Sequence, residues 1–451
     1  MKVLFIVQGE GRGHLTQAIT LEEILRRNGH EVVEVLVGKS NTRRLPGFFN
    51  RSIQAPVKRF LSPNFLPTPA NKRVNITRSV AYNLLQIPAY LHSICYIHRR
   101  IHETEADLVV NFYELLTGLT YLFFRPSVPQ VSIGHQYLFL HRDFEFPRKN
   151  SASLLMLRFF TRLTCIGAKE KLALSFRPMN EDEEAHIRVV PPLLRRDVLC
   201  CEATDGDYVH GYMVNAGFGK SISQWHEQHP EVSLHFFWDK PDEPEVCQMD
   251  ETLSFHQLDD EKFLRYMSGC RAYATTAGFE SVCEAMYLGK PLLMVPAHIE
   301  QDCNAYDAAR GGAGIISDGF EVDRLLDFAK NEYQPEDDFR SWVRSCEWRM
   351  LNRLETLEGT RFMNDYNFFP NHSLKSATLA LLTNIFSLVI GWRRLIDRRL
   401  LNHKSISRIA SRESRNWRLA RKNSDGLRFS DNSSSVCGKK CSVPSVSTAF
   451  T

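Results

Sequence analysis

One segment in the second half of the chain constrains its fold more than any other. Apolar residues 272–274 end a short buried strand, Gly278 opens a helix, and Gly289 ends that helix, as a glycine past a helix C-terminus does. The chain then reads LLMV between Pro291 and Pro296, which predicts a second buried strand. A strand, a glycine turn, a helix and a strand in this order are typical of an α/β protein.

The polar residues of this segment suit a nucleotide that carries a sugar. The N-terminus of a helix has unpaired N–H groups and a partial positive charge, which favour a phosphate, and Ser281 in the first turn can add a hydroxyl. Glu284 lies one turn further on, where a carboxylate can accept from two ribose hydroxyls. Three polar residues that suit sugar hydroxyls follow the second strand, namely Glu300, Gln301 and Asn304.

The segment resembles the donor-nucleotide motif of two-domain (GT-B) glycosyltransferases. The match is to the UDP-glycosyltransferases and to the lipid-linked GlcNAc transferase of peptidoglycan synthesis, a family 28-like pattern. The matching residues are Gly278, Ser281, Glu284, Ala285, Gly289, Pro291, Glu300, Gln301, Asn304 and Ala305. The His that often precedes the glycine in these families is Thr276 here, which leaves open what besides backbone N–H groups contacts the diphosphate. The alternative is an ordinary α/β crossover with a glycine turn.

The N-terminus predicts a second unit of the same kind. The apolar run KVLFIV is typical of a central parallel strand, and a glycine-rich turn, a helix closed by Gly29 and the strand VVEVLV follow it. The turn is not the dinucleotide fingerprint, because no third glycine stands four positions on and no acidic residue closes the second strand. The turn contains Gly9, Gly11, Gly13 and His14.

In the same two transferase families a glycine-rich loop ending in His faces the acceptor and the sugar. The resemblance therefore implies that His14 is the general base or the group that orients the acceptor. The alternative is a His that caps the helix near a phosphate. Glu114 follows a predicted strand that ends at Asn111, and we expect it to orient His14 or to take up its charge. His135 and Gln136 end another strand, where ligand groups gather in open α/β sheets.

The chain has 451 residues, too many for one core, and the sequence predicts two domains with an appendage. The resemblance implies an α/β protein with two Rossmann-like domains facing a cleft and a basic C-terminal extension. The second domain restarts with a strand and a glycine turn at Gly217, which we add to the donor-binding residues. The predicted parts are an acceptor-side domain over 1–192, a nucleotide-sugar domain with a return helix over 193–365, an amphipathic or membrane-associated helix over 366–400, and a basic, Ser-rich, disordered tail over 401–451.

The C-terminal extension has its own electrostatics. From residue 371 onward it carries 15 Lys and Arg against 4 Asp and Glu. Its apolar run over 374–392 is at the short end for a membrane span, and it suits an interfacial helix with a basic flank. A helix docked on the protein's own core and a transmembrane anchor are the alternatives. Nucleic-acid binding has no fold to support it.

The sequence as a whole predicts a glycosyltransferase that moves a sugar from a UDP-sugar to an acceptor hydroxyl, on a small molecule or a lipid-linked one. We expect no cofactor and no essential metal, because no Asp-x-Asp motif of the metal-dependent class is suitably placed and the helix dipole can hold the leaving UDP. The scattered cysteines and the absence of a secretory signal favour the cytoplasm, and the extension favours a peripheral position at a membrane.

Two other functions fit the same sequence. One is an enzyme of the UDP-GlcNAc 2-epimerase kind on the same fold, which would need several acid and base carboxylates near the sugar and no acceptor surface. The other is an inactive protein that binds a nucleotide sugar or a partner, with the tail as its working part.

Overall fold

The computed structural model describes residues 1–40, 45–63, 83, 86–148, 151–214, 216–240, 243–335 and 337–357. The helix predicted over 366–400, with its apolar run 374–392, and the tail predicted over 401–451 lie outside the described residues. Everything that follows concerns the described part of the chain.

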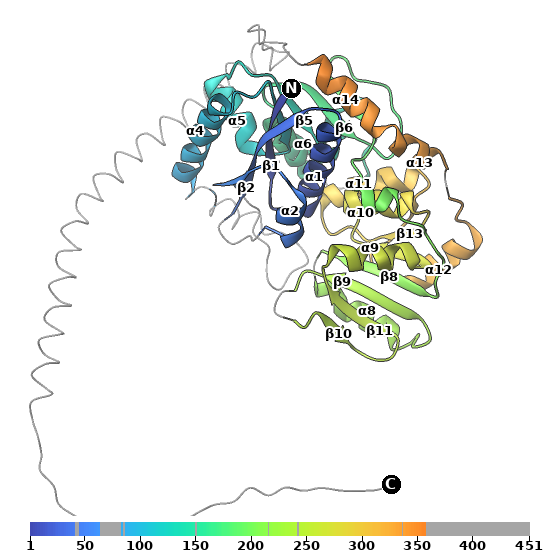
Figure 1. Cartoon of the computed structure of the whole chain (residues 1–451). Coiled ribbons are helices and arrows are strands. Elements are labelled where there is room, and N and C mark those ends of the chain that lie inside the picture. The colour runs from blue at the N-terminus through green and yellow to red at the C-terminus, as the bar shows by residue number, and fades with distance from the viewer. Residues whose placement is uncertain are drawn as a thin grey trace, which may run out of the picture. The chain divides into compact units, whose positions relative to one another are not determined.

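The first half of the chain forms a parallel sheet of seven strands in the order β3-β2-β1-β4-β5-β6-β7. Figure 1 labels β1, β2, β5 and β6 of this sheet. The central strand β1 is the predicted apolar run, and its residues alternate between two hydrophobic clusters because helices cover both faces of the sheet. The strands are β1 Lys2–Gln8, β2 Glu31–Lys39, β3 Val57–Leu61, β4 Leu108–Phe112, β5 Gln130–Ile133, β6 Ala168–Leu174 and β7 Ile187–Val190.

The helices of this half follow the strands as crossovers do. Helix α1 begins directly after the glycine-rich turn and ends with Arg26 and Arg27, where basic side chains favour a helix C-terminus. The helices are α1 Arg12–Arg27, α2 Gly47–Ser52, α4 Ile87–Glu103, α5 Leu115–Phe124, the 3-10 helix η1 His135–Leu140, α6 Ser151–Thr164 and α7 Arg196–Leu199.

The second half forms another sheet of seven strands, in the order β10-β11-β9-β8-β12-β13-β14. All neighbours pair in parallel except β10, which pairs antiparallel with β11 at the edge. The strands are β8 Tyr208–Met213, β9 Ser233–Trp238, β10 Val246–Gln248, β11 Leu253–Gln257, β12 Ala272–Thr275, β13 Leu292–Met294 and β14 Gly314–Ile316. The predicted α/β class with two Rossmann-like sheets is confirmed. The predicted domain boundary at residue 192 falls in the connection between β7 and β8.

The motif segment folds as its pattern predicts. Strand β12 leads into helix α10, Gly289 takes a left-handed φ of 72° just after that helix, and β13 follows. The helices of this half are η2 Ala216–Phe218, α8 Gly219–His226, α9 Asp260–Gly269, α10 Phe279–Tyr287, α11 Ile299–Arg310, α12 Val322–Asn331, α13 Asp337–Arg344 and α14 Cys346–Thr356.

The last described helices return to the first sheet. The indole of Trp342 donates to the Ser175 carbonyl at 2.9 Å, and Glu347 accepts from Arg27 and Asn28, both at 2.9 Å. The predicted return helix is two helices in the structure, α13 and α14. They divide at Ser345, whose hydroxyl donates to the Trp342 carbonyl at 2.7 Å.

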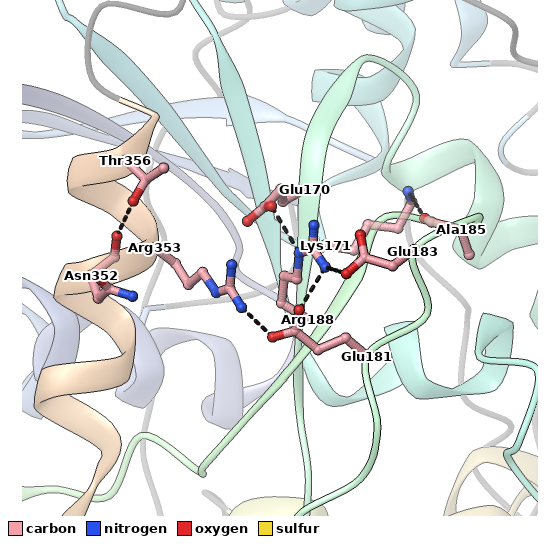
Figure 2. A network of polar contacts seen from close by, with 9 residues as sticks. All are labelled: Glu170, Lys171, Glu181, Glu183, Ala185, Arg188, Asn352, Arg353 and Thr356. Atoms are coloured by element: carbon pink, nitrogen blue, oxygen red, sulfur yellow. Dashed lines mark hydrogen bonds and ion pairs between the residues drawn. The ribbon is translucent and has the colours of Figure 1, made fainter.

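A charged network fixes α14 against strand β7 (Figure 2). Arg353 of α14 pairs with Glu181, and Arg188 of β7 also binds Glu181, at 2.6 Å. Arg188 further pairs with Glu170 at 2.9 Å and with Glu183. These contacts hold the end of the described chain beside the first sheet.

Candidate active site

The glycine-rich turn touches the second half of the molecule. A Cβ at Gly9 would lie 2.6 Å from a Val37 methyl and 2.9 Å from the Gly38 carbonyl oxygen, so only glycine fits there. A Cβ at Gly13 would lie 3.1 Å from Cγ of Glu280 in the first turn of α10. The turn after β1 and the start of the donor-motif helix are therefore in contact.

His14 lies in the first turn of α1 and is 8% exposed. Its Nδ1 lies 3.2 Å from Oε1 of Gln17, and its Nε2 lies 3.5 Å from Nε2 of Gln136. Its ring stacks on Tyr113, with the ring centroids 5.5 Å apart. Burial lowers the pKa of His14, which favours the neutral imidazole that a general base requires.

Two polar residues at the carboxyl end of β5 meet helix α11. Nε2 of His135 donates to Oδ1 of Asn304 at 2.6 Å, and Nε2 of Gln136 donates to Oε1 of Glu300 at 2.9 Å. The His135 ring also stacks on Phe279 at the start of α10, with centroids 4.2 Å apart. Two of the predicted sugar-binding residues, Glu300 and Asn304, therefore contact the residues that follow β5.

The start of α10 is built from the motif residues. Gly278 is the N-cap residue, with extended backbone, and no side chain of the described residues caps this helix end. The Ser281 hydroxyl donates back to the Gly278 carbonyl at 3.2 Å. Thr276, which replaces the His of the resembled families, accepts from the backbone N–H of Val214 at 3.2 Å.

Glu284 faces a cation from the connection between the sheets. Nη2 and Nε of Arg195 donate to Oε1 of Glu284 at 2.9 and 3.1 Å, and this carboxylate raises the pKa of Arg195. Arg195 also lines a cavity of about 260 Å³, whose walls come from α1, α2, α7 and α9.

The other two predicted donor-binding residues lie elsewhere. Gln301 bonds within its own segment, where its Oε1 accepts from the Ala297 N–H at 2.9 Å. Gly217 lies exposed in η2 between β8 and α8.

Glu114 has partners other than His14. It caps helix α5 by accepting from the Leu116 N–H at 3.0 Å, and it accepts from the Ser62 hydroxyl at 2.6 Å. Its burial raises its pKa to about 7. Among the described residues Glu114 is not a hydrogen-bond partner of His14: its Oε1 accepts from Leu116 and Ser62, and its buried Oε2 has no hydrogen-bond partner. That Glu114 orients His14 or takes up its charge stays a prediction.

Sequence reasoning missed Gln17 and Glu280. Nε2 of Gln17 donates to Oε1 of Glu280 at 2.5 Å, across the two halves of the molecule. Burial raises the pKa of Glu280 to about 8, and its Oε2 has no hydrogen-bond partner among the described residues. The available signals are weak: Gln17 lies one helical turn after His14, and Glu280 lies within the motif at a position that the motif leaves free.

Two features of the described residues bear on metals and membranes. No three of their His, Cys, Asp and Glu side chains are grouped so that they could hold a metal ion. None of their helices has the length and apolar character to cross a bilayer.

A family model described as "Glycosyl transferase family 1" matches residues 1–331. No curated protein matches the chain. Among solved structures, the glycotransferase of kitacinnamycin is similar with a TM-score of 0.55 and 14% identity, covering 79% of this chain and 99% of that one. The UGT89C1 of Arabidopsis thaliana, complexed with quercetin, has a TM-score of 0.52 and 14% identity, covering 79% and 98%.

A third similar structure is Phytolacca americana UGT2, complexed with UDP-2fluoro-glucose and pterostilbene. It has a TM-score of 0.52 and 14% identity, covering 79% of this chain and 99% of that one. At such low identity these likenesses establish the fold alone, and they confirm the predicted GT-B fold.

Proposed function

The chain belongs to glycosyl transferase family 1 and is a glycosyltransferase, and we propose that it transfers a sugar from a UDP-sugar to an acceptor hydroxyl with His14 as the general base. The observation that carries this proposal is the position of His14. It is a buried imidazole with a lowered pKa, and Gln17 and Gln136 connect it to Glu280 and Glu300 on the two helices of the donor motif.

The start of α10 supports a nucleotide diphosphate as the donor's anionic part. Its uncapped N-terminus offers backbone N–H groups, and the Ser281 hydroxyl lies in the first turn. Glu284 would accept from the ribose hydroxyls while Arg195 remains bound, since a carboxylate has about four acceptor sites and the guanidinium uses only Oε1. The solved neighbour that carries UDP-2fluoro-glucose makes UDP the first nucleotide to test.

Helix α11 supports the sugar part of the donor. Its first two turns contain Glu300, Gln301 and Asn304. Glu300 is hydrogen-bonded to Gln136, and Asn304 is hydrogen-bonded to His135. A sugar placed there would have its reacting carbon near the base. We propose that these three residues bind the sugar hydroxyls and that Gly217 lies along the donor.

The chemistry follows from these positions. Nε2 of His14 takes the proton of the acceptor hydroxyl, the acceptor oxygen forms a bond to the sugar carbon, and the bond to the UDP oxygen breaks with its electron pair. The partial charge at the start of α10 and the Ser281 hydroxyl would stabilise the leaving UDP. We propose that this reaction proceeds without an essential metal ion.

The acceptor is the finer part of the proposal. Helix α6 exposes Leu155, Met156 and Phe159, which are 66%, 61% and 51% exposed. The same helix reaches the site, because Thr161 hydrogen bonds with Tyr113 at 2.8 Å and Tyr113 stacks on His14. An apolar surface on a helix that backs the base supports a lipid-linked acceptor and a peripheral position at a membrane.

One experiment separates the candidate functions. The protein is incubated with labelled UDP-sugars, with or without a membrane lipid extract, and with or without a metal chelator. Label in the lipid fraction that survives the chelator supports the full proposal. Transfer only to water-soluble acceptors would remove the lipid part. An epimerised donor, or UDP binding without turnover in all mixtures, would overturn the proposed transfer.

A further inference from the structure

His14 lies between two pairs, each made of a glutamine from the first half of the chain and a glutamate from the second. On one side Gln17 accepts from Nδ1 of His14 and donates to Glu280. On the other side Gln136 donates both to Glu300 and to Nε2 of His14. The glutamines lie on α1 and η1, and the glutamates lie on α10 and α11.

The first pair determines where the imidazole proton lies. When Glu280 is ionised its carboxylate only accepts hydrogen bonds, so the Gln17 amide then presents its NH₂ to Glu280 at 2.5 Å. Its oxygen then faces His14 at 3.2 Å and accepts there. Nδ1 of His14 must therefore carry the proton.

The second pair favours the same tautomer from the opposite side. Gln136 presents its NH₂ to the Glu300 carboxylate at 2.9 Å, and the same nitrogen lies 3.5 Å from Nε2 of His14. As the acceptor of this contact, Nε2 of His14 carries a lone pair and no proton. The contact is long, so an acceptor hydroxyl could replace it at small cost.

We propose that Gln17 and Gln136, anchored by Glu280 and Glu300, are positioning residues that hold His14 in the Nδ1–H tautomer with the Nε2 lone pair free for the acceptor hydroxyl. The inference rests on the proposed function in one respect, because it takes His14 to be the general base. Because both anchors come from helices of the second sheet, the base is oriented when α10 and α11 contact the first sheet.

The charges support this arrangement during the reaction. When Nε2 takes the acceptor proton, the imidazolium keeps its Nδ1–H bond to Gln17, and the two carboxylates lie beyond the two glutamines. Burial raises the pKa of Glu280 to about 8, with Glu284 of the same helix raising it and Arg195 lowering it. Above that pH Glu280 is a carboxylate and can only accept.

The test is a direct reading of the tautomer at pH 9. The full chain is labelled with ¹⁵N-histidine, and the His14 signals are identified by their loss in His14→Ala. The proton on the His14 ring should be bonded to Nδ1 in the wild type. Replacement of either member of the first pair, by Gln17→Leu or Glu280→Leu, should lower the Nδ1–H fraction.

Two further variants serve as matched controls. Glu280→Gln retains an oxygen that accepts from Gln17 but adds an NH₂ that can donate to it, so its Nδ1–H fraction should lie between those of the wild type and Glu280→Leu. Glu347→Gln breaks a contact between the two halves away from His14, at Arg27 and Asn28, and should leave the tautomer unchanged. Circular dichroism checks that each variant is folded.

The same variants separate the inference from the proposed function. In a chain that turns over a UDP-sugar, Gln17→Leu should lower kcat by about tenfold or more with little change in the donor KM. A wild-type ring protonated at Nε2, or Glu280→Leu and Gln17→Leu variants that both keep the Nδ1–H form, would overturn the inference. A Nδ1–H ring in a chain that turns over no UDP-sugar would support the tautomer assignment and overturn the proposed function instead.

Discussion

Arg195 holds Glu284 through two nitrogens of its guanidinium, at 2.9 and 3.1 Å. Arg195 lies in the connection between the two sheets, and Glu284 lies in the donor-motif helix. Both contacts use the same carboxylate oxygen, Oε1, and we propose the other for the ribose hydroxyls. It therefore fixes the orientation of the proposed ribose contact before the donor binds.

Glu284→Gln should weaken UDP binding by about 1–3 kcal/mol, the cost of losing a charged hydrogen bond. The amide oxygen can still accept from Arg195, so the fold should be retained. Titration calorimetry with UDP on the folded variant and wild type measures the difference, with Glu347→Gln as a control away from the site. Equal affinities in all three proteins would remove Glu284 from the donor site.

A buried histidine should make stability depend on pH. His210 of β8 is 0% exposed and packs against the rings of Phe263 and Tyr273, and burial lowers its pKa to about 3. Below about pH 6.5 the unfolded chain binds a proton at His210 that the folded chain does not bind. The contribution of His210 to the free energy of unfolding is therefore complete above that pH and is lost as pH falls. The slope should approach about 1.4 kcal/mol per pH unit for this group.

Urea unfolding between pH 7.5 and pH 5 measures this decline. His210→Phe removes the titrating group and keeps an aromatic ring, so its stability should depend less on pH than that of the wild type. His92 is exposed on α4, and the control His92→Gln should keep the wild-type slope. Identical slopes in all three proteins would show that His210 does not titrate as its burial requires.

The exposed face of α6 should contribute to membrane binding. We expect the full chain to sediment with vesicles that contain anionic lipid, and Leu155→Ser, Met156→Ser and Phe159→Ser together should reduce the bound fraction. These side chains are exposed, so their replacement should change stability little. A double variant at exposed Leu199 and Met249 is the control. Equal sedimentation of both variants and the wild type would exclude this face from the membrane contact.

Local sequence patterns predicted much of this fold and part of its site. The strand of residues 2–7, the glycine turn and the helix after Gly278 are each specified by neighbours in the sequence, so their periodicity and glycines suffice. Glu300 and Asn304 follow a strand end, and His135 and Gln136 follow another, which is why both pairs could be predicted as ligand groups.

The remaining features depend on contacts that no local pattern contains. Gln17 and Glu280 are 263 positions apart, and only the packing of the two sheets brings them together. Its place after a strand end predicts Glu114 as a partner of His14, yet an acidic residue before a helix is also a common N-cap, and Glu114 caps α5. A position after a strand end predicts that a side chain lies near the ligand site, but it does not predict which other side chain it bonds to.

The most direct test of the account compares turnover and UDP affinity in His14→Ala. Turnover is measured with the UDP-sugar and acceptor fraction that the wild type uses, and UDP affinity is measured by calorimetry on the same protein samples. If His14 is the general base, turnover should fall about 10²- to 10⁴-fold while UDP affinity stays near that of the wild type. A folded variant that keeps most of its turnover would contradict the account and leave His14 as a structural residue of α1.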